Sequence, residues 1–216
     1  MNTTKTFLIL LFVAIAATMH AQSANEFAAQ YKGQEGINYQ DLTAFVNEVK
    51  KRFEQMPADG IPGEMPEGVP TLEEFKTFYN KIKTMEIAVT DNRQTAFRMF
   101  GAIRRLENYV PLIIYTDEVE VPEYVDSPDN VRRLRLPAAY RVEGFIYQAF
   151  GRVDEKNLLS DLIVFNSDPN IGMATCITGQ LSVEDLRIFY SIQQMMQRMQ
   201  RMQRMQHNQQ PGGPRP

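Results

Sequence analysis

Three apolar runs near the C-terminus, separated by two short polar turns, constrain the fold more than any other feature of the sequence. The runs cover residues 140–153, 158–166 and 171–179 and are rich in β-branched and aromatic residues. The turns read DEKN (154–157) and SDPN (167–170), both typical turn compositions. A parallel pairing needs a crossover of about a dozen residues or more, so connections this short predict antiparallel hairpins. The C-terminal half is therefore predicted to be an antiparallel β-meander.

The first half of the sequence has helical periodicity. Residues 38–56 predict an amphipathic helix with Asp41 as its N-cap, because apolar residues recur at three- and four-residue steps. A second helix is predicted to begin at Thr71, which opens the capping-box pattern T-x-x-E, and a third to span 91–107 with its first residue as the cap. Between them, residues 84–90 alternate polar and apolar side chains and predict a short strand.

The other segments complete a single α+β domain over residues 22–194. Residues 110–121 are predicted to be partly strand, with Pro111 at a sheet edge or at the start of the strand, and 122–129 to be loop. Ser182 is predicted to cap a closing C-terminal helix. Helices packed on an antiparallel sheet are the simplest arrangement of these elements.

Residues 1–21 have the pattern of a signal peptide. Lys5 precedes an uninterrupted apolar run over 7–17, which is long enough for a signal-peptide core and too short for a membrane span. Cleavage is predicted after Ala21. No second long apolar stretch follows, so we expect an exported protein, periplasmic or extracellular, with no transmembrane anchor after cleavage.

Two segments have compositions that do not form a packed core. Residues 57–70 hold four prolines and three glycines, which predicts a surface loop. Residues 195–216 repeat Gln-Arg-Met and end in glutamine, proline and glycine, which predicts a low-complexity tail. The tail is basic, whereas residues 22–186 carry 17 basic and 26 acidic side chains, a net charge of −9. This balance gives no basis for nucleic-acid binding.

The tail contains candidate metal ligands, because thioethers suit soft ions such as Cu(I) and Ag(I). The candidates are Met196, Met199, Met202, Met205 and His207. A three-residue period winds the methionines around a helix instead of gathering them, and arginines lie between them, so a frayed helical extension is the alternative. The same arginines could make a weak contact with an anionic surface.

Cysteine and histidine are scarce. Cys176 is the only cysteine, so no intramolecular disulfide can form, and both histidines (His20 and His207) lie outside the predicted domain. Within the domain this excludes Ser-His-Asp and Cys-His catalysis as well as histidine zinc sites. Cys176 lies in the middle of a predicted strand, and we expect it to be a small buried residue.

Acidic residues near position 120 are the remaining candidates for catalysis. A pair among Asp117, Glu118, Glu120 and Glu123 could serve as acid and base in a hydrolase. The alternative is a charged edge strand that prevents sheets from associating. The basic residues that could form an anion pocket, although we expect them to face solvent, are Arg104, Arg105, Arg132, Arg133 and Arg135.

Two stretches carry a resemblance to a known family: LLSDLIVF at 158–165 and ATCITGQLSVEDL at 174–186. An alternating strand, a second strand ending in I-x-G and the pattern x-L-x-x-L leading into a helix resemble the C-terminal signature of an exported bacterial family, the domain of unknown function 4252 (DUF4252). A looser similarity over 27–190 implies the same organisation of signal peptide, helical stretch and domain. The family has no established activity, so the resemblance implies no functional residues.

Together these features predict an exported, non-catalytic globular module that needs no cofactor and binds an unidentified protein or envelope component. A carboxylate-dependent hydrolase and a Cu(I)- or Ag(I)-binding protein are the alternatives.

Overall fold

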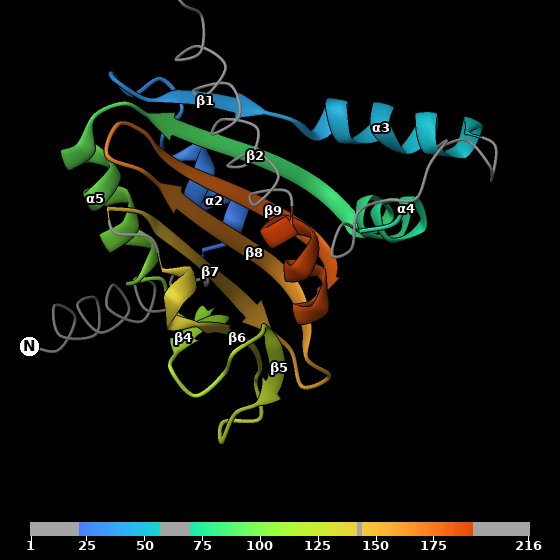
Figure 1. The fold of residues 1–216 in the computed structure, drawn as a ribbon. Helices are drawn as coiled ribbons and strands as arrows, with labels where there is room; N and C mark the ends of the chain where they lie inside the picture. The colour runs from blue at the N-terminus through green and yellow to red at the C-terminus, as the bar shows by residue number, and fades with distance from the viewer. Residues whose placement is uncertain (1–21, 57–69, 142–143, 192–216) are drawn as a thin grey trace, which may run out of the picture.

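A six-stranded antiparallel sheet forms the centre of the computed structural model, which describes residues 22–56, 70–141 and 144–191 (Figure 1). Its strand order is β1-β2-β9-β8-β7-β3. The strands β7, β8 and β9 are neighbours joined in sequence order, so the predicted meander is confirmed. Helices lie on both faces of the sheet, and the predicted α+β class is confirmed as well.

The strands of the central sheet are Asn38–Asp41 (β1), Ile82–Thr90 (β2), Val110–Pro111 (β3), Ile146–Val153 (β7), Leu158–Ser167 (β8) and Gly172–Ser182 (β9). β3 is an edge strand, as the proline in it requires, because proline has no N–H to donate to a second neighbour. β7 begins later than predicted, because Ala138–Tyr140 form a short 3-10 helix (η1) before it.

A second sheet of three strands lies beside the central one: β4 (Ile113–Thr116), β5 (Glu123–Asp126) and β6 (Arg132–Pro137), in the order β4-β6-β5. The β4–β6 pair is parallel, and the β5–β6 pair is antiparallel. The prediction of a loop at 122–129 is wrong, because β5 occupies its centre. Acidic residues of β5 lie directly opposite arginines of β6, and such pairs stabilise a strand whose own sequence is too charged to predict one.

Leu112 joins the two sheets through its backbone. Its N–H donates to the carbonyl of Ala149 in β7 at 2.8 Å, and its own carbonyl accepts the N–H of Leu134 in β6, also at 2.8 Å. The Leu112 side chain is fully buried. It packs so closely that a Cβ added at Gly151 would lie 2.7 Å from its Cδ1 atom. Leu112 is the single residue between β3 of the central sheet and β4 of the small sheet.

One face of the central sheet is covered by α2 (Ala24–Ala29) and α5 (Arg93–Ile103). Phe27 of α2 and Met99 of α5 are buried in the same hydrophobic cluster as Cys176 of β9. The expectation that Cys176 is buried is therefore confirmed, and burial raises the pKa of its thiol.

The N-terminus of α2 is tied to the sheet by Asp161, a β8 residue that is 2% exposed. One oxygen of the Asp161 carboxylate accepts the N–H of Ala24 at 2.9 Å. The other oxygen accepts from the Ser160 hydroxyl at 2.8 Å and from the Arg152 guanidinium. A buried carboxylate is thus balanced by a cation and by the first amide of the helix.

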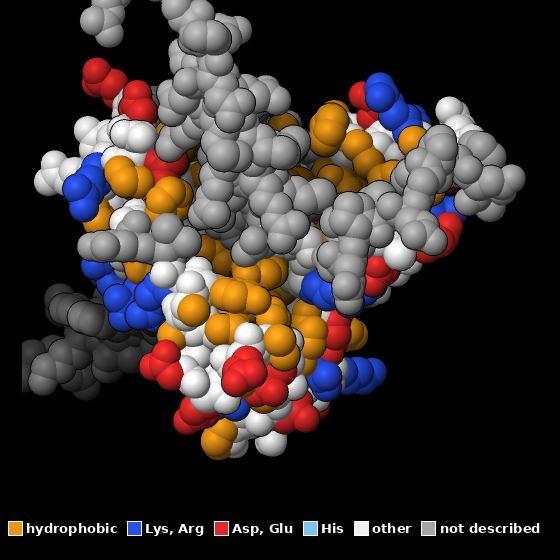
Figure 2. All heavy atoms as spheres, viewed as in Figure 1, with side chains coloured by type: hydrophobic (Ala, Val, Ile, Leu, Met, Phe, Trp, Pro, Cys, Tyr) orange, Lys and Arg blue, Asp and Glu red, His pale blue; other side chains and the backbone are white. Residues whose placement is uncertain are grey.

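The opposite face is covered by the three-stranded sheet, by α4 (Leu72–Lys81) and by a C-terminal helix at residues 186–191. Ser182 and Asp185 form a capping box around the 3-10 turn η2 (Val183–Asp185), which leads into that helix, so the predicted cap is confirmed. Figure 2 shows a band of hydrophobic side chains on this face, over the three-stranded sheet and the C-terminal helix.

The first predicted helix is shorter in the structure. Residues 38–41 form β1, because pairing with β2 overrides the local helical periodicity, and α3 covers Thr43–Gln55. Asp41 still accepts the first amide of the helix at 2.9 Å, but as the last residue of the strand. Val46 is buried as expected, whereas Phe45 of the same predicted apolar stripe is 54% exposed.

The next two helices differ less from prediction. The capping box that begins at Thr71 is confirmed. The N-cap of α5 is Asn92 in place of Asp91, since the Asn92 carboxamide accepts a helix amide at 2.9 Å. α5 ends at Ile103, and not at 107, because the following amides close tight turns that lead toward β3.

Three sequence predictions fall on residues outside the described ranges. These are the signal peptide (1–21), nearly all of the proline-rich loop (57–69) and the tail with its candidate metal ligands (192–216). In the described part of the chain, no helix combines the length and the apolar character needed to cross a membrane.

Candidate functional site

The arginines of β6 do not form an open anion pocket. Arg133, expected to face solvent, is 8% exposed. Its Nε donates to the Pro111 carbonyl at 2.9 Å, and its two terminal nitrogens donate to the two oxygens of Asp129 at 2.6 Å. This bidentate contact holds the pKa of Asp129 at about 2. The expectation is wrong for Arg133 because its guanidinium takes part in joining β3 to β6.

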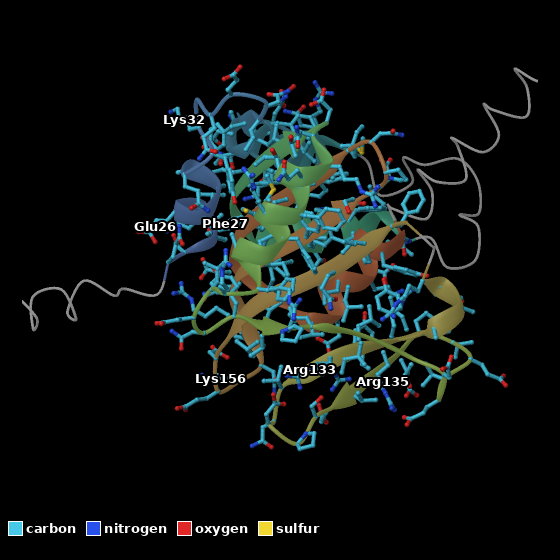
Figure 3. All side chains as sticks on the ribbon, turned by 90° about the vertical axis from the view of Figure 1, so that its left-hand side faces the viewer. Glu26, Phe27, Lys32, Arg133, Arg135 and Lys156 are labelled. Atoms are coloured by element: carbon cyan, nitrogen blue, oxygen red, sulfur yellow. The ribbon has the colours of Figure 1, made fainter. Side chains whose placement is uncertain are left out.

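The other two β6 arginines also bind carboxylates. Arg135 forms ion pairs with Glu118 and, at 3.2 Å, with Glu123. Arg132 pairs with Glu184 at 2.7 Å. Figure 3 shows Arg133 and Arg135 in the three-stranded sheet, below α2 and its Phe27. We call this row of pairs the arginine ladder.

The arginine ladder accounts for part of the predicted hydrolase set. Glu118 and Glu123 share one guanidinium, an arrangement that stabilises the sheet. Asp117 and Glu120 are exposed and form no ion pair with a described residue. Arg104 lies over the ring of Phe100 on its own helix, 6.0 Å from the ring centroid, and adds nothing to the ladder. Among the described residues, no group of three or more His, Cys, Asp or Glu side chains could hold a metal ion.

A different group of side chains gathers where the three-stranded sheet meets the C-terminal helix. We call it the tyrosine cluster; its members are Tyr115 (β4), Tyr140 (η1), Tyr147 (β7) and Tyr190 (C-terminal helix). The rings of Tyr140 and Tyr190 are stacked, with an angle of 8° between their planes and 6.0 Å between centroids. Tyr147 lies 6.2 Å from Tyr190. The hydroxyl of Tyr115 donates to the Tyr147 carbonyl at 3.1 Å and so fixes the fourth ring.

Arg141 adds a positive charge to this cluster. Its guanidinium carbon lies 5.1 Å from the centroid of the Tyr115 ring, a cation–π contact. Arg141 is exposed, and no carboxylate of the described residues pairs with it. It differs in this respect from the arginines of the ladder, whose charges are all matched by carboxylates.

The cluster combines exposed and buried rings. Tyr140 is 40% exposed, whereas Tyr147 is only 9% exposed. The hydroxyl of Tyr147 is buried and has no hydrogen-bond partner in the described part of the chain. Burial raises the pKa of Tyr115 to about 12 and also raises that of Tyr147, so both keep their protons at neutral pH. The cluster therefore offers an aromatic surface and a cation without a carboxylate partner among the described residues, with the Tyr147 hydroxyl buried inside it.

The tyrosine cluster could not be predicted from the sequence, because its four tyrosines do not recur at a regular interval along the chain. The sequence has nine tyrosines and no tryptophan, a composition that does not single out these four. They meet only because β4 and β6 pair side by side and η1 follows β6 directly. A cluster made by non-local pairing leaves no local motif.

The fold and the cluster together define an α+β protein with an aromatic surface site. No family model matches the chain, and the chain matches no curated protein and no solved structure. The resemblance to DUF4252 stays a prediction.

Proposed function

We propose that the chain is an exported, non-catalytic module that binds a component of the cell envelope through the tyrosine cluster. The observation that carries this proposal is the stacked pair of Tyr140 and Tyr190 beside Arg141, which pairs with no carboxylate of the described residues. Aromatic rings with polar tips are enriched where proteins bind partners, because they bury much apolar area and lose little side-chain entropy. The arginines of the ladder are matched by carboxylates, whereas Arg141 pairs with no carboxylate of the described residues.

A binding role fits the chemistry of the described residues better than hydrolysis does. Two of the four candidate carboxylates hold Arg135, and the other two are exposed and form no ion pair with a described residue. General acid–base catalysis needs two positioned groups that face the same reacting bond. Carboxylates that share one arginine support the strand pairing of β5 and β6.

Export enters the proposal through the predicted signal peptide. The first described helix, α2, begins at Ala24, shortly after the predicted cleavage site at Ala21. Its cap, Ser23, bonds to Glu26 within the helix, so the start of α2 is capped by residues that follow the predicted cut. Cleavage would leave the domain intact in the periplasm or outside the cell.

The test is sedimentation of the purified exported chain with cell-envelope fragments. We expect the chain to sediment with the fragments and Tyr140→Ala to lose most of this binding. Phe97→Ala is the matched control, because Phe97 is 52% exposed on α5 and also carries an arginine, Arg93, over its ring. Thermal unfolding of each variant checks that it folds. Absence of sedimentation, or equal loss in both variants, would overturn the proposal.

A further inference from the structure

We infer that the ligand of the tyrosine cluster is an acidic sugar, a pyranose that carries a carboxylate, as found in uronic-acid polysaccharides. This inference rests on the proposed function and specifies the chemistry of the same site. It follows from three features of the cluster: the flat stacked rings, a guanidinium without a carboxylate partner among the described residues, and a buried hydroxyl that likewise has no described hydrogen-bond partner.

The stacked pair supplies a rigid platform. Tyr140 and Tyr190 lie within 8° of parallel, so each ring restrains the orientation of the other. Tyr140 keeps 40% of its surface exposed and can pack against the C–H face of a sugar ring. Because the platform exists before binding, little conformational entropy is lost when a ligand docks. A flat, half-exposed aromatic surface with polar edges matches a pyranose in both shape and polarity.

Arg141 supplies the selectivity for an acid. The arginines of β6 and β7 each face a carboxylate of this chain. Arg141 instead lies with its guanidinium on the Tyr115 ring, which holds it in place while its N–H groups stay available. Guanidinium and carboxylate form paired, charge-assisted hydrogen bonds. A sugar carboxylate would provide the partner that the described residues do not.

Tyr147 supplies the third feature. Its hydroxyl is buried without a hydrogen-bond partner among the described residues, and its ring lies 6.2 Å from that of Tyr190. Leaving a buried hydroxyl unpaired is unfavourable. Because this hydroxyl is buried, a hydroxyl-rich ligand would satisfy it where binding shifts the neighbouring rings.

The charge of residues 22–186 limits how densely charged the ligand is. Residues 22–186 carry a net charge of −9, which repels densely charged polymers such as nucleic acids and strongly anionic membranes. One arginine without a carboxylate partner among the described residues matches one carboxylate at a time. A short oligosaccharide with carboxylate-bearing sugars suits this site better than a long, densely charged polymer does.

The experiment is calorimetric titration of the exported chain with trigalacturonate and trimannuronate, and with their methyl esters, which keep the rings and remove the charge. We expect at least one of the two acids to bind. Its methyl ester should bind at least about tenfold more weakly, since a charge-assisted hydrogen bond is lost. Tyr140→Ala and Arg141→Gln should each weaken binding about tenfold, whereas Tyr140→Phe, which keeps the ring, should stay within about threefold.

The matched controls are Phe97→Ala and Arg93→Gln, which alter the similar exposed pair on α5 and should leave binding unchanged. Failure of both acids to bind, equal affinity for acid and ester, or binding unaffected by Tyr140→Ala would overturn the inference. If envelope sedimentation still depends on Tyr140 while neither acid binds, the sugar assignment falls and the proposed function stands. If sedimentation fails as well, both fall.

Discussion

Lys81 and Asp185 lie 104 residues apart in the sequence and form a salt bridge, with the Lys81 Nζ atom 2.9 Å from both carboxylate oxygens of Asp185. The same carboxylate accepts the Ser182 backbone N–H at 2.7 Å, which closes the capping box of η2. Asp185 is 7% exposed. One side chain thus ties the end of α4 to the start of the C-terminal helix, the element that carries Tyr190 into the tyrosine cluster.

Replacing Asp185 should therefore destabilise the domain. We expect Asp185→Asn to lower the free energy of unfolding by about 2 kcal/mol, because a largely buried charge pair loses one member while its size is kept. Urea unfolding measures this change. Glu48→Gln is the control, since Glu48 pairs with Arg52 on the exposed surface of α3 and should cost about 0.5 kcal/mol or less. Equal losses in the two variants would contradict the prediction.

Two glycines should respond in opposite directions to alanine. A Cβ added at Gly179 would lie 2.2 Å from the carbonyl oxygen of Lys81, so Gly179→Ala must displace backbone and should cost about 2 kcal/mol or more. Gly101 lies inside α5 with no atom within 4 Å of an added Cβ, so Gly101→Ala should stabilise by about 0.5 kcal/mol. Thermal unfolding of both variants tests whether Gly179→Ala lowers the melting temperature and Gly101→Ala raises it.

Glu86→Gln should stabilise the protein at neutral pH. Glu86 is 8% exposed, and its Oε2 atom has no hydrogen-bond partner among the described residues. Burial raises its pKa, with Asp41 adding to the effect, while a hydrogen bond from Tyr39 and the charge of Lys32 oppose it. Cys176 lies opposite on β9. The folded state therefore holds the Glu86 proton more tightly than the unfolded chain does.

Stability from this proton is fully present below the ordinary pKa of 4.5 and is lost as pH rises through the higher folded value. We expect Glu86→Gln to exceed the wild type by about 1 kcal/mol near pH 7 and to match it near pH 4. Unfolding free energies at these two pH values decide the question. If the variant is less stable than the wild type near pH 7, the ionised Glu86 carboxylate stabilises the fold and the prediction is wrong.

The contribution of Asp129 to stability should depend on pH in the opposite direction to that of Glu86. Contact with Arg133 lowers its pKa from 3.8 to about 2, so its contribution is present above pH 3.8 and is lost as pH falls through about 2. Asp129→Asn should lose stability near neutral pH and show less further loss on acidification. Melting temperatures between about pH 2 and pH 5 measure this. Asp117→Asn, an exposed site without an ion pair to a described residue, should retain the acid sensitivity of the wild type.

The tail prediction concerns residues outside the described ranges. We expect deletion of residues 198–216 to change the free energy of unfolding by about 0.5 kcal/mol at most, as for other changes away from a core. Calorimetric scans and titrations with Cu(I) and Ag(I) of both forms measure stability and metal binding together. A loss of several degrees, or a change in oligomeric state, would show that the methionines pack against the domain. Lost metal binding with unchanged stability would favour the metal-binding alternative.

The parts of the fold that could be predicted from sequence are those determined by residues close together in the chain. The turns after β7 and β8 consist of strong turn residues, and Asp154 and Asp168 accept backbone amides within them. The capping box at Thr71 is equally local. β1 could not be predicted in this way, because it exists by pairing with β2, which is distant in sequence. β5 and β6 pair with each other nearby, but β5 lacks the apolar alternation typical of strands and β6 is rich in arginine.

The candidate site could be predicted even less. Two of the four acidic residues that suggest a catalytic pair, Glu118 and Glu123, bind Arg135 of a strand that the sequence does not reveal. Tyr140 and Tyr190 are fifty positions apart and meet only after both sheets and the C-terminal helix have assembled. Side-chain chemistry can be recognised in a sequence, but its assignment to a site requires the topology.

The backbone of Leu112 has a consequence for how the molecule comes apart. Since this one residue donates to the central sheet and accepts from the small one, neither sheet can peel away while the other keeps its ladder. Separating the two sheets at this junction therefore breaks a backbone hydrogen bond on one side of Leu112 or the other. Amide protons of Leu112 and Leu134 should therefore exchange with solvent only when the whole domain opens, and at matched, slow rates.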